Sequence, residues 1–257
     1  MIEIRDVFKT FKLSRQQKRE MGSSFRGDTV DAVAGLTFTC QPGRVFGLLG
    51  PNGAGKTTTL RMIATMLKPT SGSIVVGGHD AVKHPERVRA ALGFLTGSTQ
   101  LYDRLTAQEL VRYYADLHGV SGDDFRRRRD EIFAALEMGD YADRRIGKLS
   151  SGMKQKVSIA RTMIHDPDVL VLDEATAGLD VVASRAIVDL IRRARDRGKT
   201  VLFSTHRMGE VGQLCDDLAI VHRGRLLYDG AYAEFSRQMQ APTLEDEFIR
   251  RIEAVGP

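Results

Sequence analysis

The sequence has no long apolar run, few cysteines and no internal repeat. No stretch approaches the roughly 20 apolar residues that a membrane-spanning helix needs. The N-terminal stretch MIEIRDVFKTF is charged where a signal peptide requires an apolar run, so we expect the chain to stay in the cytoplasm. The two cysteines, Cys40 and Cys215, lie apart without CxxC spacing, which is typical of reduced structural thiols and argues against a disulfide framework or a cysteine metal site.

The composition is that of an ordinary globular protein. The apolar fraction is 42% and the charged fraction 28%, which excludes a fibre and argues against disorder. The 257 residues can bury one core, or one core with a smaller appended lobe. The formal charge is only +5, but positive residues cluster at 12–19, 126–129 and 192–197. Such runs can contact nucleic acid or anionic lipid head groups, although solvated helix faces are the commoner explanation.

Apolar periodicity predicts strands that alternate with helices, interrupted by one wholly helical segment. Strands are indicated at 2–8, 33–40, 44–49, 169–173 and 201–206, helices at 56–67 and around 186–194, and a hairpin at 217–230. From about 96 to 165 only helical patterns occur, and Thr106 and Glu109 have capping-box spacing. We therefore expect an α/β domain over residues 1–257, with a core lobe at about 1–95 and 166–257 and a helical lobe at about 96–165.

A phosphate-binding loop is predicted at GPNGAGKTT, between an expected strand and an expected helix. Glycines allow a tight loop whose backbone N–H groups point at phosphate oxygens, and the positive end of the helix dipole adds to the attraction. Lys56 supplies a full charge for the β and γ phosphates, and the Thr57 hydroxyl can bind Mg²⁺. The residues expected to bind nucleotide are Gly50, Pro51, Asn52, Gly53, Ala54, Gly55, Lys56, Thr57 and Thr58.

Two acidic residues end the apolar run VLVLDE. Asp173 would lie at the carboxyl end of the sheet, beside the phosphate loop, where it can hold Mg²⁺ directly or through water. Glu174 is the candidate general base or water-orienting residue. The pair predicts hydrolysis of a nucleoside triphosphate.

The ordered motifs GPNGAGKTT, LSSGMKQ, VLVLDEAT, AGLD and STH resemble those of the nucleotide-binding subunit of ABC transporters, over essentially the whole chain. The resemblance implies a P-loop NTPase core with a parallel sheet flanked by helices, an antiparallel β portion near the N-terminus and an inserted helical lobe. It also implies ATP and Mg²⁺ as cofactors.

The signature motif of that family is represented by Ser150 and Gly152, whereas Ser151 and Met153 depart from its commonest form. The resemblance implies that Ser150, Gly152 and the following amides bind ATP held by the phosphate loop of a second copy of an ATP-binding subunit. Ser150 is also placed to cap the helix that follows, and the two roles are compatible.

The resemblance also assigns Asp180 to the D-loop, which runs along the partner, and His206 to the switch region, where it contacts the γ-phosphate. Phe11 falls where the family places an aromatic residue that stacks on adenine, although a core role is the alternative. The glutamine of the family's Q-loop is replaced by Gly97, and Gln100 lies three residues later. Tyr102 and Leu105 either face the membrane subunit or pack in the helical lobe.

These residues predict a cytoplasmic ATPase on the inner face of the cell membrane that energises a separate integral membrane permease by ATP-driven closure of a dimer. The sequence is most similar to exporters of the sodium-efflux and drug-export type, so export is favoured. The alternative is a soluble ABC ATPase acting on nucleic acid or ribosomes. Such proteins typically carry two cassettes or long coiled coils, neither of which is present, so a nucleic-acid partner is not expected.

Overall fold

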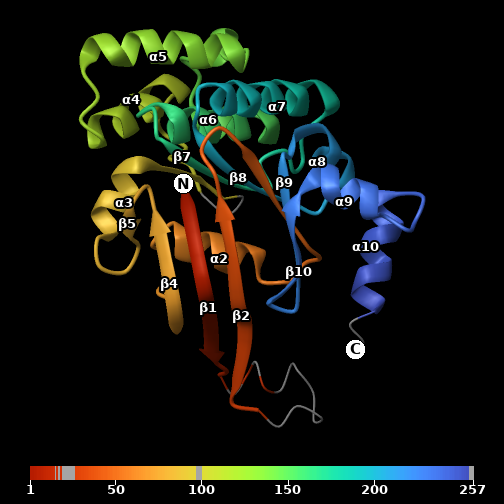
Figure 1. Cartoon of the computed structure of the whole chain (residues 1–257). Helices are drawn as coiled ribbons and strands as arrows, with labels where there is room; N and C mark the ends of the chain where they lie inside the picture. Colours follow the sequence, from red (N-terminus) through yellow and green to blue (C-terminus); the bar gives the residue numbers. More distant parts are fainter. Residues whose placement is uncertain (15, 17, 19–26, 97–99, 255–257) are drawn as a thin grey trace.

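Two β-sheets and a set of surrounding helices form the molecule (Figure 1). The structure is a computed structural model that describes residues 1–14, 16, 18, 27–96 and 100–254. Residues 15, 17 and 19 of the basic run at 12–19, and the Q-loop position Gly97, lie outside these described residues.

The first sheet has four strands and is antiparallel, as expected for the N-terminal part of the chain. Its strand order is β2-β1-β4-β5, with β1 at Ile2–Lys12, β2 at Thr29–Cys40, β4 at Ser71–Val76 and β5 at His79–Asp80. Strand β1 runs past the predicted end at residue 8, because its last four residues continue the ladder with β2. The sheet therefore reaches well below the rest of the molecule in Figure 1.

The second sheet has six strands in the order β10-β9-β3-β8-β7-β6. These are β3 at Val45–Leu49, β6 at Leu92–Leu95, β7 at Val169–Asp173, β8 at Thr200–Thr205, β9 at Asp217–His222 and β10 at Arg225–Ala231. Strands β3, β6, β7, β8 and β9 are mutually parallel, and β10 pairs antiparallel with β9 in the expected hairpin. The carboxyl ends of β3, β7 and β8 therefore meet at one edge.

Side chains alternate between two cores on opposite faces of the six-stranded sheet. In β3, Val45 and Leu49 join the core with the larger set of helices, whereas Phe46 and Leu48 face α2 (Lys56–Ile63) and the four-stranded sheet. Helix α2 is thus packed between the two sheets. It ends four residues before the predicted end at residue 67, because the amides of Thr65 and Met66 turn back to carbonyls in its last turn.

The remaining helices flank the sheets or follow them. They are α3 at Pro85–Ala91, α4 at Ala107–Leu117, α5 at Gly122–Ala135, α6 at Ser151–Met163, α7 at Val181–Asp196, α8 at Met208–Leu214, α9 at Tyr232–Gln238 and α10 at Leu244–Glu253. The predicted capping box starts α4: the Glu109 amide donates to Thr106 Oγ1 at 3.1 Å and the Thr106 amide to Glu109 Oε2 at 2.8 Å. No strand occurs within the described residues 100–165.

Two expectations from composition can be compared with the fold. Both Cys40 and Cys215 are buried and unpaired, as expected for structural thiols, and burial raises the pKa of each thiol. Within the described ranges, no helix has the length and apolar character needed to cross a bilayer.

Candidate functional site

The phosphate loop connects β3 to α2 and borders a cavity of about 280 Å³. All of its residues from Pro51 to Thr58 line this cavity, together with Ala32 and Glu174. Two glycines of the loop have no room for a side chain: a Cβ on Gly50 would lie 2.3 Å from the Val221 carbonyl oxygen, and one on Gly55 2.3 Å from that of Ala32. Gly55 also has a φ of 102° and offers no side-chain cap to α2. The first amides of α2 are therefore available to an anion.

Lys56 lies at the start of α2 and is 5% exposed. Its Nζ donates to the carbonyl oxygens of Gly50 at 2.6 Å and Pro51 at 3.1 Å, which positions the ammonium along the loop. Burial lowers the pKa of Lys56, while the nearby carboxylates of Glu174 and Asp173 act in the opposite direction. An ammonium has three donors, so this side chain can bind a phosphate oxygen without leaving the loop.

Strands β7 and β8 bring the two acidic residues and His206 to the same edge of the sheet. Asp173 is paired with Ser204 in the ladder, and Ser204 Oγ donates to Asp173 Oδ1 at 2.5 Å. Glu174 has a φ of 50°, and its amide donates to the Ser204 carbonyl at 3.1 Å and contacts Ser204 Oγ at 3.3 Å. The Glu174 Oε1 and His206 Nδ1 atoms are 2.9 Å apart. Ser204 thus holds both acidic residues, and Glu174 faces His206.

The donor set suits Mg²⁺. Within the described part of the chain, no three His, Cys, Asp or Glu side chains lie close enough to form a metal cage by themselves. Mg²⁺ is commonly held by one or two protein oxygens together with phosphate oxygens and water. Thr57 lines the phosphate cavity, and Asp173 lies close enough to the loop for its charge to oppose the effect of burial on the pKa of Lys56, so the Thr57 hydroxyl and the Asp173 carboxylate would hold the ion, which would neutralise charge on bound phosphates.

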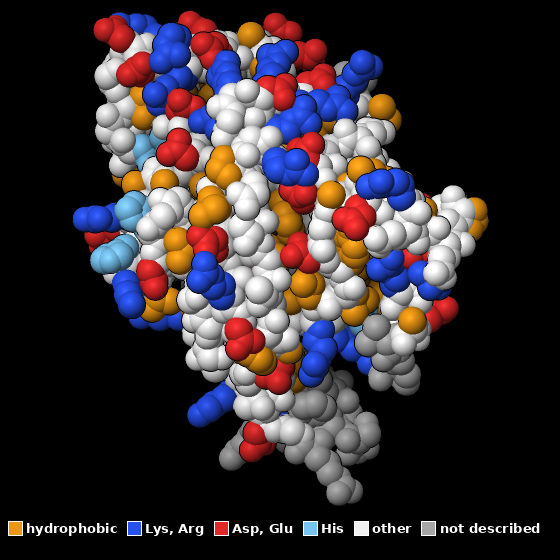
Figure 2. Space-filling model, viewed as in Figure 1, with side chains coloured by type: hydrophobic (Ala, Val, Ile, Leu, Met, Phe, Trp, Pro, Cys, Tyr) orange, Lys and Arg blue, Asp and Glu red, His pale blue; other side chains and the backbone are white. Residues whose placement is uncertain are grey.

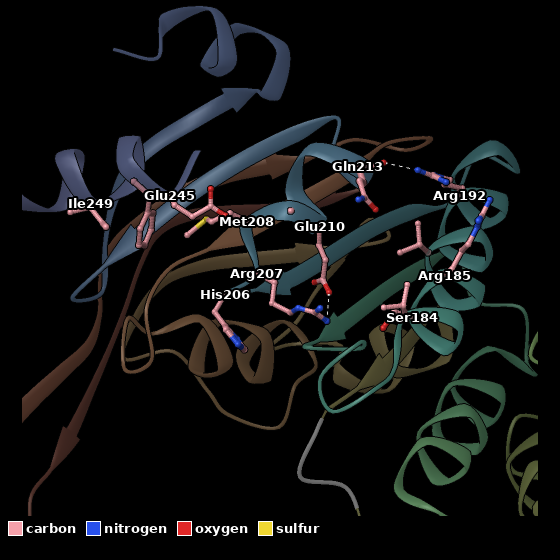
Figure 3. Close-up of a pocket in the computed structure, with 14 residues that line it drawn as sticks. Ser184, Arg185, Arg192, His206, Arg207, Met208, Glu210, Gln213, Glu245 and Ile249 are labelled. Carbon is pink, nitrogen blue, oxygen red and sulfur yellow. Dashed lines mark hydrogen bonds and ion pairs between the residues drawn. The ribbon is translucent and has the colours of Figure 1, made fainter. Parts of the chain in front are cut away.

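The Glu210 side chain joins the segment that follows β7 to the end of β8. The Thr176 hydroxyl donates to Glu210 Oε1 at 2.6 Å, the Thr205 hydroxyl donates to Oε2 at 2.7 Å, and Arg207 lies 3.0 Å from Oε1. Figure 3 shows Glu210 and Arg207 beside His206, at the border of a second cavity of about 900 Å³ between α7, α8 and α10. The Glu210 carboxylate therefore connects the segment that follows Glu174 with the residue that precedes His206.

The signature and D-loop residues lie away from the phosphate cavity of their own chain. Ser150 is exposed and caps α6 as predicted, since its Oγ accepts from the Met153 amide at 3.2 Å. Asp180 is exposed and caps α7 by accepting from the Ala183 amide at 2.8 Å. A Cβ on Gly152 would lie 3.4 Å from the Leu179 side chain. None of these residues lines the 280 Å³ cavity.

The start of α6 and the D-loop are connected within the chain. Gln155 donates from Nε2 to the Ala175 carbonyl at 2.8 Å, and both Gln155 and the D-loop residue Gly178 line a third cavity. Gln100 lines that third cavity and not the phosphate cavity. Phe11 is 38% exposed, lies under the Lys9 ammonium at 5.1 Å, and also does not line the phosphate cavity.

Three residues of the site were missed as individual contributors: Ser204, Gln155 and Glu210. Ser204 belongs to the motif STH and Gln155 to LSSGMKQ, and neither motif by itself indicates the contact that the residue makes. Glu210 lies on α8, and no sequence motif marks it. Each acts through a contact with a segment distant in sequence.

Comparison with known proteins gives consistent matches. A family model described as ABC transporter matches residues 33–177. The chain is 42% identical to the ABC transporter ATP-binding protein NatA of Bacillus subtilis, over 87% of this chain and 91% of that protein. It is 38% identical to the Nod factor export ATP-binding protein I of Burkholderia pseudomallei, over 80% of this chain and 68% of that protein.

A solved structure has the same fold. It is described as the dimeric structure of an ATP-binding cassette in a post-hydrolysis state, bound to ADP and Pi. The TM-score is 0.77 at 23% identity, over 90% of this chain and 98% of that chain. The P-loop architecture expected from the motifs, with its N-terminal antiparallel sheet, is thus confirmed.

Proposed function

The chain belongs to the ABC transporter family and is an ATP-binding ATPase subunit of it, and from this premise we propose that its ATPase cycle drives a separate integral membrane exporter. The convergence of Lys56, Glu174 and His206 at the carboxyl edge of the parallel sheet supports the ATPase cycle, and the similarity to a Nod factor export ATP-binding protein supports its coupling to export. Such an edge is where α/β proteins bind nucleotides.

The arrangement accounts for hydrolysis. The loop amides and Lys56 hold the phosphates, and Thr57 and Asp173 would hold Mg²⁺, which would neutralise charge on the phosphates. The Glu174 carboxylate orients the attacking water and accepts its proton, and His206, 2.9 Å away, fixes that carboxylate and contacts the γ-phosphate. Positioning and charge stabilisation of this kind supply most of the catalysis in phosphoryl transfer.

We propose that ATP joins two copies of the subunit. Ser150, Gly152 and Asp180 are remote from the phosphate cavity of their own chain and lie on exposed or half-exposed backbone. The amides at the start of α6 can therefore bind the γ-phosphate held by the partner's loop. Each nucleotide would be enclosed by two subunits, head to tail.

The permease contact is proposed at the aromatic surface that precedes and includes α4. Tyr102 is 58% exposed and Tyr113 is 45% exposed, and their rings meet edge to face at 6.3 Å. Leu105 instead packs against the core, so of the two candidate contact residues Tyr102 is the exposed one. Exposed aromatic clusters of this kind are typical of protein interfaces. Such docking would place the ATPase on the inner face of the cell membrane.

A dimer-trapping experiment tests the proposal. The Glu174→Gln variant should bind ATP without hydrolysing it and elute as a dimer on size exclusion with ATP, whereas Lys56→Ala should remain monomeric. A Glu174→Gln protein that binds ATP and stays monomeric would contradict the sandwich. Co-purification from membranes, compared between wild type and Tyr102→Ala, tests the permease contact: a bound multi-span protein retained equally by both would refute the assigned surface.

A further inference from the structure

The two arginine runs of the sequence meet in one cleft. Residues 126–129 lie on α5 and residues 192–197 lie at the end of α7, and the two helices lie near each other in the upper part of Figure 1. Between them is a cavity of about 220 Å³. Its cationic lining residues are Arg127, Arg128, Arg193, Arg197 and Lys199. Figure 2 shows Lys and Arg side chains, interspersed with acidic ones, over this part of the surface.

The arginines of each run divide into two groups. Arg126 and Arg129 bind Asp123 and Asp130 on their own helix and do not line the cavity. The same holds for Arg195, which lies 2.9 Å from Asp196. Of the arginines that line the cavity, Arg128, Arg193 and Arg197 have no ion pair with an acidic residue of their own helix among the described residues. Arg127 is the exception, since it lies 2.8 Å from Asp124.

Only two carboxylates line the cavity against its five cations, which leaves a formal excess of three positive charges. Asp166 lies 2.5 Å from Lys199 and only 4.0 Å from Arg128. Glu131 is shared, at 3.4 Å from Arg197 and 3.8 Å from Arg127. Lys199 is therefore closely paired, as Arg127 is with Asp124, whereas the ion pairs of Arg128 and Arg197 measure 3.4 Å or more, so the poorly compensated positive charge of the cleft lies on Arg128, Arg193 and Arg197.

Two arginines of the cleft have donors without a protein partner, although Arg128 also donates from Nη1 to the Ile164 carbonyl at 3.4 Å. Within the described part of the chain, the guanidinium group of Arg193 makes no ion pair or hydrogen bond, and the residue's only contact of this kind outside the helix ladder is its carbonyl, which accepts from the Arg197 amide at 3.1 Å. The Nε atom of Arg128 is buried without a hydrogen-bond partner among the described residues. A buried donor without a partner is unfavourable, and water or an anion in the cleft would satisfy it.

We propose that this cleft is an anion site, separate from the ATP site, for a phosphate-bearing ligand of diphosphate size or smaller. Guanidinium groups bind phosphate through paired N–H donors, and a concave surface with excess positive charge concentrates anions. The walls belong to α5 and to α7, so a bound phosphate group cross-links the segment assigned to the helical lobe with the core. The ligand is either a soluble phosphate compound or a lipid phosphate group.

Calorimetric titration with pyrophosphate tests the site. It is done in a Lys56→Ala background, which disables the phosphate loop without touching the cleft. The Lys56→Ala protein should bind pyrophosphate, and adding Arg193→Ala and Arg197→Ala should weaken binding at least about tenfold, because two charge-assisted contacts are lost. Adding Arg126→Ala is the matched control and should leave the affinity unchanged, since that arginine lies outside the cavity.

Absence of pyrophosphate binding by the Lys56→Ala protein, or equal affinity in the double-arginine and Arg126→Ala proteins, would overturn the proposal. Arg127→Ala, from the opposite wall, serves as a second variant if the double variant fails to fold. Flotation with phosphatidylcholine vesicles, with and without phosphatidic acid, identifies the source. Binding that requires phosphatidic acid and the two arginines indicates a lipid phosphate, and pyrophosphate binding without vesicle binding indicates a soluble one.

Discussion

Replacing Ser204 by Ala should separate catalysis from nucleotide binding. The Ser204 side chain is fully buried, and its hydroxyl donates to Asp173 at 2.5 Å and lies 3.3 Å from the Glu174 amide. The substitution removes both contacts but leaves the Glu174 amide its 3.1 Å bond to the Ser204 carbonyl. The Asp173 carboxylate loses the hydroxyl that orients it, and the Glu174 amide keeps one of its two acceptors.

The size of the effect follows from one lost bond to a charged group. Such a bond contributes about 1.5 to 3 kcal/mol, and about 1.4 kcal/mol is a factor of ten, so kcat should fall about 10-fold to 150-fold. ATP affinity should change little, because Lys56 and the loop amides are untouched. The Mg²⁺ concentration for half-maximal activity should rise, since Asp173 loses its aligned geometry. Steady-state ATPase assays across Mg²⁺ and ATP concentrations measure all three quantities.

A matched control lies on the same strand. Thr200 is buried at the opposite end of β8, and its hydroxyl accepts from the Met1 ammonium at 2.8 Å. Thr200→Val also removes a buried hydroxyl from β8, so it should lower stability without lowering kcat. Unchanged turnover in folded Ser204→Ala, or an equal loss in Thr200→Val, would refute the reasoning.

Three further changes test other parts of the structure. Gly55→Ala should abolish ATP binding measured by calorimetry, because its Cβ would collide with the Ala32 carbonyl at 2.3 Å; retained affinity would contradict the loop geometry. Ser150→Phe should prevent ATP-driven dimerisation on size exclusion while the monomer still binds ATP, and unchanged dimerisation would reduce Ser150 to a helix cap. Burial of the ring, with a smaller effect of His118, lowers the pKa of His165 from 6.5 to about 4. As the pH falls, His165 therefore takes up its proton at a higher pH in the unfolded chain than in the folded chain. The free energy of unfolding should therefore fall by up to about 3 kcal/mol between pH 6.5 and 4, and urea titrations of His165→Gln should show a smaller fall; equal slopes would exclude His165 as the cause.

Local patterns were sufficient for the motifs and for many of the elements, although not for β4, α3 or β6. Thr106 with Glu109, and Ser150 with Met153, interact within one helical turn, so their spacing in the sequence already specified the contact. The phosphate loop and VLVLDE were readable for the same reason, since a turn or strand end determines where each side chain points.

Contacts between distant segments could not be read in this way. Ser204 reaches Asp173, and Gln155 reaches Ala175, only because β7, β8 and α6 pack together. Strand β6 was missed because its four residues are too short to show a period. The cleft between α5 and α7 was also invisible, because each arginine run by itself resembles a solvated helix face.

The Glu210 carboxylate has a consequence for how two active sites would work together. Through Thr176 and Thr205 it ties the chain leading to the D-loop to the chain leading to His206. If two copies close on ATP as proposed, displacement of the D-loop by one subunit would reposition the histidine of the same chain through Glu210. Occupation of the two sites would be cooperative, with a Hill coefficient above one for ATP hydrolysis that falls toward one when Glu210 is replaced by an apolar residue.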